Sequence, residues 1–378
     1  MSFSEEQVAF RDNVRRMVAR HVAPIAAEID ETDRFPLELV KLFGEMGLMQ
    51  LWVPERYDGP NGNLTMACIA REEISKVSPA CASIAALNTM FIMPLLHFGS
   101  EEQRRRYLPI IAKGGVVTAI AISEPQAGSD VAALNTRARR DGDSYILNGR
   151  KQWCSYGVVA DYIVVMARTS DGAGADGISA FIVERGMKGF RTAQKLDKLG
   201  MRGSDTCELV FEDCEVPEEN VLGPVGKGVN VLMSGLDYER AVLAAGPVGI
   251  MQAALDVVVP YVHERKQFDT PIGEFQLVQA MLADMQTGVM AGRALVRDAA
   301  QMWVSGTDRR IAPSAAKLFC TEMVGKVADL AVQVHGGSGY MRDVPVERIY
   351  RDVRLLRLYE GTSEIQRLVI ARNETGLR

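Results

Sequence analysis

The apolar positions of the first third of the chain repeat at the spacing of an amphipathic helix. Two series fall near a period of 3.6 residues: Phe10, Val14, Met17 and Val18, then Leu37, Val40, Leu42 and Met46. The stretch 58–63, rich in Gly, Pro and Asn, interrupts the pattern as turn residues do. The pattern therefore predicts helices over residues 1–115.

Residues 116–225 have the pattern of β-strands instead. Runs rich in β-branched and aromatic residues occur at 116–122, 145–147, 162–166, 178–183 and 207–211. The dipeptides Asp141-Gly142 and Asn148-Gly149 flank the second run, and such pairs are typical of two-residue hairpin turns. We therefore predict a β domain with a hairpin at each of these two dipeptides.

From about Gly226 the helical period returns in long segments rich in Ala, Leu and Met. The order helices, strands, helices is typical of an α+β protein with segregated layers and not of alternating βαβ units. We predict three domains: an N-terminal helical domain (1–115), a middle β-barrel or sandwich domain (116–225) and a C-terminal helical domain (226–378).

Residues 172–177 spell G-x-G-x-x-G, the pattern of a dinucleotide-binding loop. In such a loop the glycines precede a helix whose N-terminus holds the phosphates. Here the segment lies between two predicted strands with no helix after it. We therefore expect a flexible turn.

Composition excludes several classes of protein. A net charge of −5 argues against a nucleic-acid binder, which would show clustered basic surface. The six cysteines include no C-x-x-C pair and fit reduced thiols better than a disulfide framework. The N-terminus has no leader pattern, and no apolar run approaches the roughly 18 residues that span a bilayer. With four histidines that lack ligand spacing, we expect a cytoplasmic protein without a metal or membrane insertion.

Glu360 is the first candidate for catalysis. It follows the apolar-basic run 355–359 and precedes Gly361. Ser363 and Gln366 are spaced as a capping box, which predicts that a helix begins there. A carboxylate on a glycine-containing turn before a helix is well placed to face a ligand, although a solvated turn glutamate has the same pattern.

Glu239 is the second candidate, because it interrupts an apolar helical face. That face carries Leu232, Leu236, Leu243 and Ile250. A buried carboxylate costs several kcal/mol unless it is paired or protonated, and burial raises its pKa. Such a group suits proton abstraction near neutral pH, and a structural ion pair with an arginine is the alternative.

Two further segments have the composition of ligand-binding loops. Residues 122–130 follow the first strand run and offer hydroxyls and backbone N–H groups in a bend. The run Gly336-Gly337-Ser338-Gly339 allows close backbone approach. Ordinary turns have the same composition, so neither segment identifies a ligand by itself.

Taken together, five segments resemble those of the acyl-CoA dehydrogenase family, and the similarity runs through nearly the whole chain. They are S-E-P-Q-A-G-S-D (123–130), W-C-S (153–155), E-R-K-Q-F (264–268), Q-V-H-G-G-S-G (333–339) and Y-E-G-T-S-E-I-Q-R (359–367). The resemblance implies an N-terminal helical domain, a middle β domain and a C-terminal four-helix bundle, usually in a homotetramer. It also implies that FAD lies between the β domain and the C-terminal helices.

The same resemblance implies which positions contact the cofactor and the substrate. Those expected at FAD are Ile120, Ile122, Ser123, Ser129, Trp153, Cys154, Ser155, Arg265, Phe268, Gln276, Gln333, Gly336, Gly337, Thr362 and Glu364. Of these, Arg265, Gln276 and the 333–337 turn are expected at the diphosphate and adenosine end, partly across a subunit interface. Those expected at the substrate are Ser129, Asp237, Arg240, Tyr359 and Gly361.

The implied reaction is the desaturation of an acyl-CoA between its α and β carbons. A glutamate removes the α-proton while hydride passes from the β carbon to flavin N5. The backbone N–H of the catalytic glutamate and a flavin ribityl hydroxyl polarise the thioester carbonyl. Electron-transfer flavoprotein is the electron acceptor that the resemblance implies.

Members of the family take the catalytic base from one of two alternative positions. This chain departs from that pattern because it has a glutamate at both. Most members use the position of Glu360, whereas the isovaleryl-CoA type uses that of Glu239 and has a small residue at the other. Residues 232–276 resemble the isovaleryl type, but Tyr359 to Gly361 resemble the short- and medium-chain type. We expect Glu360 to be the base and a linear short- to medium-chain acyl-CoA the substrate. A branched-chain dehydrogenase and a non-catalytic acyl-CoA-binding flavoprotein are the alternatives.

Overall fold

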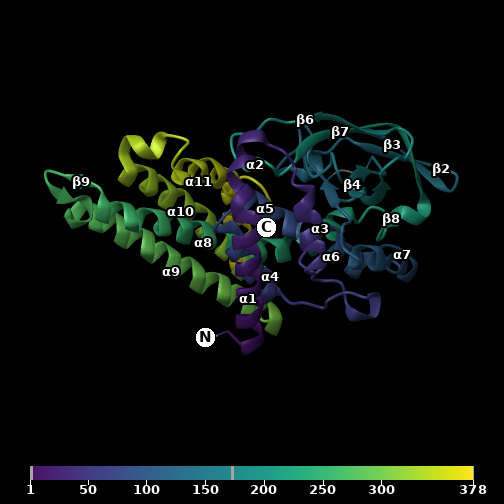
Figure 1. Ribbon diagram of the computed structural model, residues 1–378. Helices are drawn as coiled ribbons and strands as arrows, with labels where there is room; N and C mark the ends of the chain where they lie inside the picture. Colours follow the sequence, from purple (N-terminus) through teal and green to yellow (C-terminus); the bar gives the residue numbers. More distant parts are fainter. Residues whose placement is uncertain (1–2, 172–173, 378) are drawn as a thin grey trace.

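The computed structural model describes residues 3–171 and 174–377 of the chain. Figure 1 shows long helices on one side and the strands on the other, with α1, α4 and α5 between them. The predicted α+β order of helices, strands and helices is therefore confirmed.

The N-terminal part is helical throughout. Its helices are α1 (Glu5–Met17), α2 (Ala26–Thr32), α3 (Leu37–Glu45), α4 (Leu64–Ser75), α5 (Pro79–Ala86), α6 (Thr89–Phe98) and α7 (Glu101–Ala112). Capping boxes begin α1 and α7, formed by Ser4 with Gln7 and by Ser100 with Gln103. Each box satisfies backbone N–H groups that the start of a helix leaves free.

The middle part is an eight-stranded sheet with the order β6-β7-β3-β2-β4-β5-β8 and β1 paired to β4. The strands are β1 (Thr118–Ala121), β2 (Arg137–Asp141), β3 (Ser144–Ser155), β4 (Tyr162–Arg168), β5 (Ile178–Glu184), β6 (Phe190–Lys195), β7 (Thr206–Pro217) and β8 (Val221–Leu222). The N–H of Gln152 donates to the carbonyl of Ser123 at 2.9 Å. The segment after β1 therefore lies against the end of β3.

One of the two predicted hairpins is correct and the other is wrong. Residues 142–143 turn β2 into β3, with Asp141 opposite Ser144. Asn148 and Gly149 lie inside β3, where the register with β7 shifts. A Cβ at Gly149 would lie 2.6 Å from Thr136 Oγ1, so glycine allows close approach of β3 to the segment that leads into β2. The dipeptide marks a β-bulge and not a turn.

Of the G-x-G-x-x-G segment, residues 172 and 173 lie outside the described residues. Residues 174–177 lead directly into β5. The element that follows is a strand, so the phosphate-binding arrangement at a helix N-terminus does not form here.

The C-terminal part is built on three long helices, α8 (Gly228–Glu264), α9 (Gln276–Ser305) and α10 (Ile311–His335). The shorter elements are α11 (Pro345–Val353), α12 (Ser363–Thr375) and the hairpin β9 (Lys266–Gln267) with β10 (Thr270–Pro271). Helix α8 packs against α4, α6, α9 and α10. It therefore joins the N-terminal and C-terminal helices into one helical layer.

Among the described residues, two helical stretches are long and apolar enough to cross a membrane by length and composition, Pro79–Phe98 and Gly228–Glu264. The expectation that no apolar stretch would reach that length is therefore wrong. Of each apolar window, 78% and 72% respectively is buried inside the protein. Their apolar character is explained by contact with other helices and with the sheet, as in a core helix.

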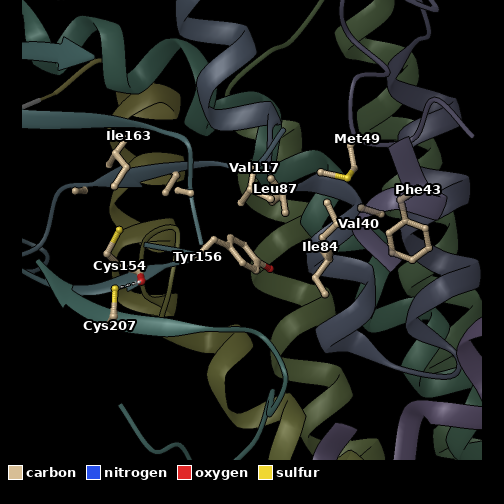
Figure 2. Close-up of a cluster of buried hydrophobic side chains, with 14 of the residues drawn as sticks. Val40, Phe43, Met49, Ile84, Leu87, Val117, Cys154, Tyr156, Ile163 and Cys207 are labelled. Carbon is tan, nitrogen blue, oxygen red and sulfur yellow. Dashed lines mark hydrogen bonds between the residues drawn. The ribbon is translucent and has the colours of Figure 1, made fainter. Parts of the chain in front are cut away.

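The core continues from the helices into the sheet. Figure 2 shows Tyr156 lying between the strands that carry Cys154 and Cys207 and the helical side that carries Ile84 and Leu87. The Tyr156 hydroxyl lies 2.6 Å from Ser83 Oγ and accepts a hydrogen bond from Ser204. This contact ties the end of α5 to the β domain.

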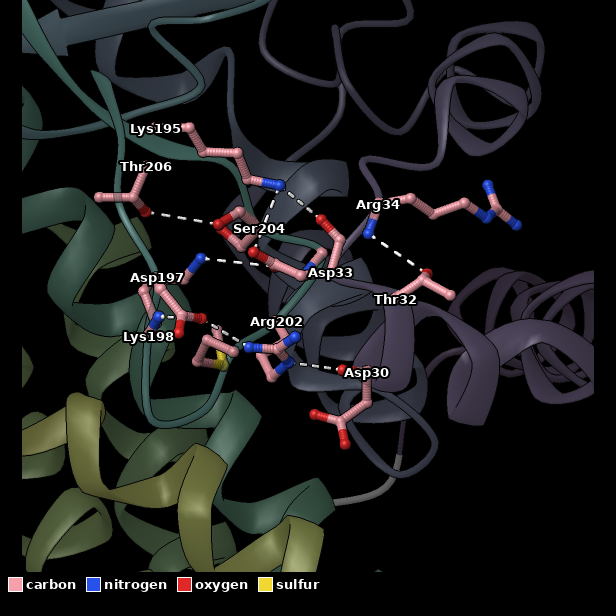
Figure 3. Close-up of polar contacts among 12 residues, drawn as sticks. Asp30, Thr32, Asp33, Arg34, Lys195, Asp197, Lys198, Arg202, Ser204 and Thr206 are labelled. Carbon is pink, nitrogen blue, oxygen red and sulfur yellow. Dashed lines mark hydrogen bonds and ion pairs between the residues drawn. The ribbon is translucent and has the colours of Figure 1, made fainter.

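A polar cluster around the buried Asp33 also holds the same two parts together. Figure 3 shows Asp33, at the end of α2, facing the loop that joins β6 to β7. Asp33 accepts a hydrogen bond from Gly203 N at 2.7 Å and forms ion pairs with Lys195 and Lys198. The β6–β7 loop is thereby positioned on the N-terminal helices.

Candidate active site

A cavity of about 230 Å³ lies where the three parts of the chain meet. Its lining comes from α4 to α6, the ends of β1 and β3, the β6–β7 loop, α8 and the segment before α12. The lining residues are Arg71, Ser83, Ala86, Leu87, Met90, Thr118, Ala119, Ile120, Ile122, Ser123, Gln152, Trp153, Cys154, Ser155, Tyr156, Lys198, Met201, Ser204, Thr206, Leu236, Glu239, Leu355, Tyr359 and Glu360. Both predicted catalytic glutamates are therefore in one cavity.

The β-domain wall contains six of the residues that the sequence places at FAD: Ile120, Ile122, Ser123, Trp153, Cys154 and Ser155. Trp153 has a left-handed φ of 57° and is 56% exposed. The register of β3 against β7 shifts between Lys151 and Cys154, and this irregularity accompanies the unusual backbone of Trp153. The buried Cys154 thiol lies 3.4 Å from the Ile120 carbonyl, which links β3 to β1.

A buried ion pair supports this wall from behind. Lys151 Nζ lies 2.6 Å from Glu124 Oε1 and donates to the carbonyl of Ile122 at 3.0 Å. Glu124 also accepts from the N–H groups of Asn135 and Thr136. Burial raises the pKa of Glu124, but the Lys151 ammonium and these hydrogen bonds lower it to about 2. Glu124, within the predicted loop motif, is therefore an anchor for residues 122–123.

Glu360, which also lines the cavity, is held in a strained turn. It has a left-handed φ of 55°, which is uncommon for a residue with a Cβ. Its carbonyl accepts from Arg240 Nε at 3.3 Å and from Gln366 Nε2 at 3.1 Å. The next carbonyl, of Gly361, accepts from Lys317 Nζ at 2.9 Å. These donors, from α8, α10 and α12, fix the turn.

The predicted helix start after Glu360 is confirmed, but the predicted cap is wrong. Helix α12 begins at Ser363, and the N-cap is Thr362, whose side chain accepts from Ile365 N. Gln366 reaches back to the carbonyls of Glu360 and Gly361 instead of closing a capping box. Thr362 alone caps the helix, so the side chain of Gln366 is available to fix the turn that contains Glu360 and Gly361.

Within the described residues, the backbone N–H of Glu360 donates no hydrogen bond. Its carboxylate oxygen Oε2 is buried without a partner, although the residue as a whole is only half-buried. A free N–H next to a free carboxylate can polarise a carbonyl and accept a proton from the neighbouring carbon.

Glu239, on α8, is buried and its Oε2 also has no partner. Burial and the negative charge of Glu360 raise the pKa of Glu239 to about 8, against the opposing effect of Arg71. Burial likewise raises the pKa of Glu360, while Arg71, Lys317 and Arg240 oppose the shift. The two carboxyl groups therefore titrate as an interacting pair.

This titration predicts a specific dependence of stability on pH. A carboxyl group whose pKa is raised by folding stabilises the fold below its unfolded pKa, and this stabilisation is lost as pH rises through the folded pKa. We expect the Glu239→Gln substitution to reduce the decline in the free energy of unfolding between pH 5 and 8 by roughly 2–4 kcal/mol. Urea denaturation at several pH values measures it. An unchanged pH dependence would show that Glu239 is not buried as described.

The predicted substrate residues have different positions. Tyr359 lines the cavity, and its buried hydroxyl has no partner. Asp237 and Arg240 do not line it; Arg240 Nη1 donates to Asp237 Oδ1 at 2.6 Å and helps to hold the Glu360 turn. Gly361 has a φ of 91° and continues that turn. Ser129 is exposed and outside the cavity lining.

The remaining residues expected at FAD, which include those assigned to its diphosphate and adenosine end, do not line this cavity. Arg265, Phe268 and Gln276 lie at the far ends of α8 and α9, near β9 in Figure 1, and Phe268 is 91% exposed. Gln333, Gly336 and Gly337 are exposed at the end of α10. Thr362 and Glu364 lie at the start of α12. Their expected part in FAD binding stays a prediction.

Arg71 and Lys198 were missed by the sequence reasoning. Arg71, on α4, is only 6% exposed, and Lys198 lies in the β6–β7 loop. A charge among the apolar residues of α4 is a signal for Arg71, as it is for Glu239 on α8. No pattern in the loop marks Lys198.

Among the described residues no cluster of His, Cys, Asp and Glu could hold a metal ion.

Comparison with known proteins gives the class of this fold and site. The N-terminal, middle and C-terminal domains of acyl-CoA dehydrogenases match residues 4–115, 119–214 and 226–375. The chain therefore belongs to the acyl-CoA dehydrogenase family and is an FAD-dependent oxidoreductase, as the resemblance predicts. This family membership favours an enzyme over the alternative of a non-catalytic acyl-CoA-binding flavoprotein.

Individual relatives cover almost the entire chain. The mitochondrial isovaleryl-CoA dehydrogenase of Solanum tuberosum is 49% identical over 98% of this chain and 90% of its own. The structure of butyryl-CoA dehydrogenase from Megasphaera elsdenii matches with a TM-score of 0.96 at 34% identity, covering 99% of both chains. A chain in a structure of the electron transferring flavoprotein of Acidaminococcus fermentans matches with a TM-score of 0.95 at 39% identity, also covering 99% of both.

The cavity fits the flavin that the family requires. Trp153 presents a large exposed aromatic side chain, and the adjacent wall combines apolar Ile120 and Ile122 with the hydroxyls of Ser123 and Ser155. A planar ring system with a polar edge needs this combination of apolar contact and hydrogen bonding. These five residues would hold the flavin ring of FAD.

Proposed function

We propose that this cavity desaturates a short- to medium-chain acyl-CoA at its α and β carbons, with Glu360 as the base. One observation carries the proposal: Glu360, whose buried carboxylate oxygen Oε2 has no partner, and the residues fitted to the flavin line the same cavity. A substrate between them would have the base on one side and the electron acceptor on the other.

The residues of the chain act on the thioester as follows. The unused N–H of Glu360 donates to the thioester carbonyl and stabilises the negative charge that develops on its oxygen. The Glu360 carboxylate then removes the α-proton that this polarisation has acidified. Bound FAD would supply the acceptor for the hydride that leaves the β carbon. Arg240 and Gln366 hold the Glu360 carbonyl, so the N–H and the carboxylate keep their orientation.

Branched-chain dehydrogenation is the second candidate function, because Glu239 lines the same cavity. The relative from Solanum tuberosum is an isovaleryl-CoA dehydrogenase, and the chain resembles that type around Glu239. Tyr359 favours the linear substrate in this proposal, since its large ring lines the cavity and leaves less room for a branch than a small residue would.

The substrate is tested by a panel of linear and branched acyl-CoAs. We expect butyryl- and hexanoyl-CoA to reduce the flavin with a higher kcat/KM than isovaleryl-CoA, because Tyr359 crowds the cavity. Stopped-flow bleaching of the purified holoenzyme measures the rates. Faster turnover of isovaleryl-CoA would favour the branched-chain function, and Tyr359→Gly, which makes room for a branch, should shift the preference in that direction.

Three further expectations stay proposals. Electron-transfer flavoprotein is the proposed electron acceptor, in line with the similarity to a chain from an electron transferring flavoprotein structure. A homotetramer would bring the exposed residues around Arg265 to a neighbouring subunit. A cytoplasmic location and a role in fatty-acid β-oxidation are proposed from the sequence.

A further inference from the structure

Arg71 is a buried cation in the cavity that the proposed reaction does not use. Its side chain is 94% covered, lines the cavity and has a buried Nε without a hydrogen-bond partner. Within residues 3–171 and 174–377, its guanidinium makes no hydrogen bond or ion pair. A buried guanidinium normally has such partners, because leaving its donors unpaired is costly.

The surroundings of Arg71 are also polar and unpaired. Tyr359 Oη and Glu239 Oε2 are buried without partners in the same cavity. Arg71 interacts electrostatically with Tyr359, Glu239, Glu360 and Tyr156, so all four lie within range of its charge. A purely apolar acyl tail would satisfy none of these groups and would remove them further from water. This part of the cavity suits a polar end of the acyl chain.

The charge of the site identifies the polar group. The cavity contains two cations, Arg71 and Lys198, and Lys198 already has Asp33 as an ionic partner at 3.7 Å. The carboxyl groups of the cavity are Glu239 and Glu360, whose mutual repulsion disfavours ionisation of both, so that one remains protonated and the two cations are not fully balanced. A planar guanidinium pairs best with a carboxylate, through two parallel hydrogen bonds.

We propose that Arg71 binds a carboxylate at the far end of the acyl chain, so that the preferred substrates are CoA monothioesters of short dicarboxylic acids. This inference rests on the proposed desaturation and specifies its substrate class. The thioester end lies at the Glu360 N–H, and the distal carboxylate pairs with Arg71. Tyr359 Oη and a protonated Glu239 are the nearby groups that can donate to the same carboxylate.

A different role for Arg71 predicts a different result. As a mere counter-ion for Glu239 and Glu360, Arg71 would act on the bases, and its removal would slow every acyl-CoA to the same extent. As a carboxylate-binding residue, its removal changes the ratio between substrates with and without the distal carboxylate. The ratio therefore separates specificity from an effect on the bases.

The experiment compares two pairs of substrates with equal carbon number, glutaryl- with pentanoyl-CoA and adipyl- with hexanoyl-CoA. For the holoenzyme we expect the carboxylated member of at least one pair to have the higher kcat/KM. Arg71→Met should lower the carboxylated-to-plain ratio of that pair by about 100-fold, as expected when one partner of a buried, hydrogen-bonded charge pair is removed. Arg71→Lys should give an intermediate ratio, because it keeps the charge but loses the planar fork.

Lys198→Met is the matched control, because it removes the other cation of the cavity lining. Its ratio should change by less than about threefold. Equal losses for both members of a pair in Arg71→Met would overturn the inference, as would a wild-type protein that shows no preference for carboxylated substrates. If Arg71→Met does not fold, the wild-type preference and the Arg71→Lys ratio decide. Absence of flavin reduction by all four acyl-CoAs would instead refute the proposed function.

Discussion

Replacing Glu360 with Gln is expected to slow flavin reduction by about 10²–10⁴-fold or more, because Gln keeps the size of the side chain but cannot accept the α-proton. The substitution leaves the carbonyl contacts of the turn with Arg240 and Gln366 in place, since these involve the backbone. The backbone N–H that polarises the thioester is also retained. The loss therefore reports on proton abstraction. Stopped-flow bleaching with one good acyl-CoA measures it.

Glu239→Gln is the matched control, because both glutamates line the same cavity and have an unpaired buried oxygen. The free backbone N–H of Glu360 can polarise the thioester carbonyl, which orients the α-proton toward the Glu360 carboxylate and not toward Glu239. We expect a loss of about tenfold or less. The reverse ranking of the two variants would move the base to Glu239. Small and equal losses would show that either carboxylate can replace the other.

The second large effect is expected at the ion pair behind the flavin-facing wall. Glu124→Gln should lower the free energy of unfolding by about 3–5 kcal/mol, because it leaves the ammonium of Lys151 buried without a compensating charge. The same change should weaken FAD retention, since the pair anchors Ile122 and Ser123 on the cavity wall. Urea denaturation of the FAD-saturated protein and the flavin content after dialysis measure the two effects.

A double variant and a surface pair complete this test. Glu124→Gln combined with Lys151→Met removes both charges, so its destabilisation should be smaller than the sum of the two single changes. The control is Arg137→Met, which breaks an ion pair with Asp171 whose side chains are both largely exposed. It should change stability little, because solvent screens exposed pairs. Additive losses in the double variant would show that the two residues do not act as a pair.

Much of the fold follows from patterns that are local in the sequence. The periods of apolar residues predict the helices and strands because each period reflects which face of one element is buried. The Asp141-Gly142 turn is confirmed for the same reason, since it depends on the conformations of adjacent residues. Asn148-Gly149 has the same local signal, but there the glycine permits a bulge against Thr136, a residue of another segment.

The candidate site, like the fold, has features that the local sequence predicts and features that depend on contacts between distant segments. Glu239 and Glu360 are recognisable in the sequence, one as a charge on an apolar helical face and one as part of a motif before a helix. Their meeting in one cavity depends on how α8 packs beside the turn before α12, and so do their raised pKa values. A pKa depends on neighbours and burial in three dimensions, which no spacing along the chain describes.

The sequence by itself determined the order of helices and strands, the family, the flavin chemistry and the two carboxylates that can act as the base. Only the tertiary structure placed Arg71 from α4 beside those carboxylates and paired Lys151 with Glu124 behind the cavity wall. Arg71 is 168 and 289 positions away from Glu239 and Glu360 in the chain. Contacts over such separations arise from the packing of whole elements, whereas motifs and periods record only what each element requires of its own residues.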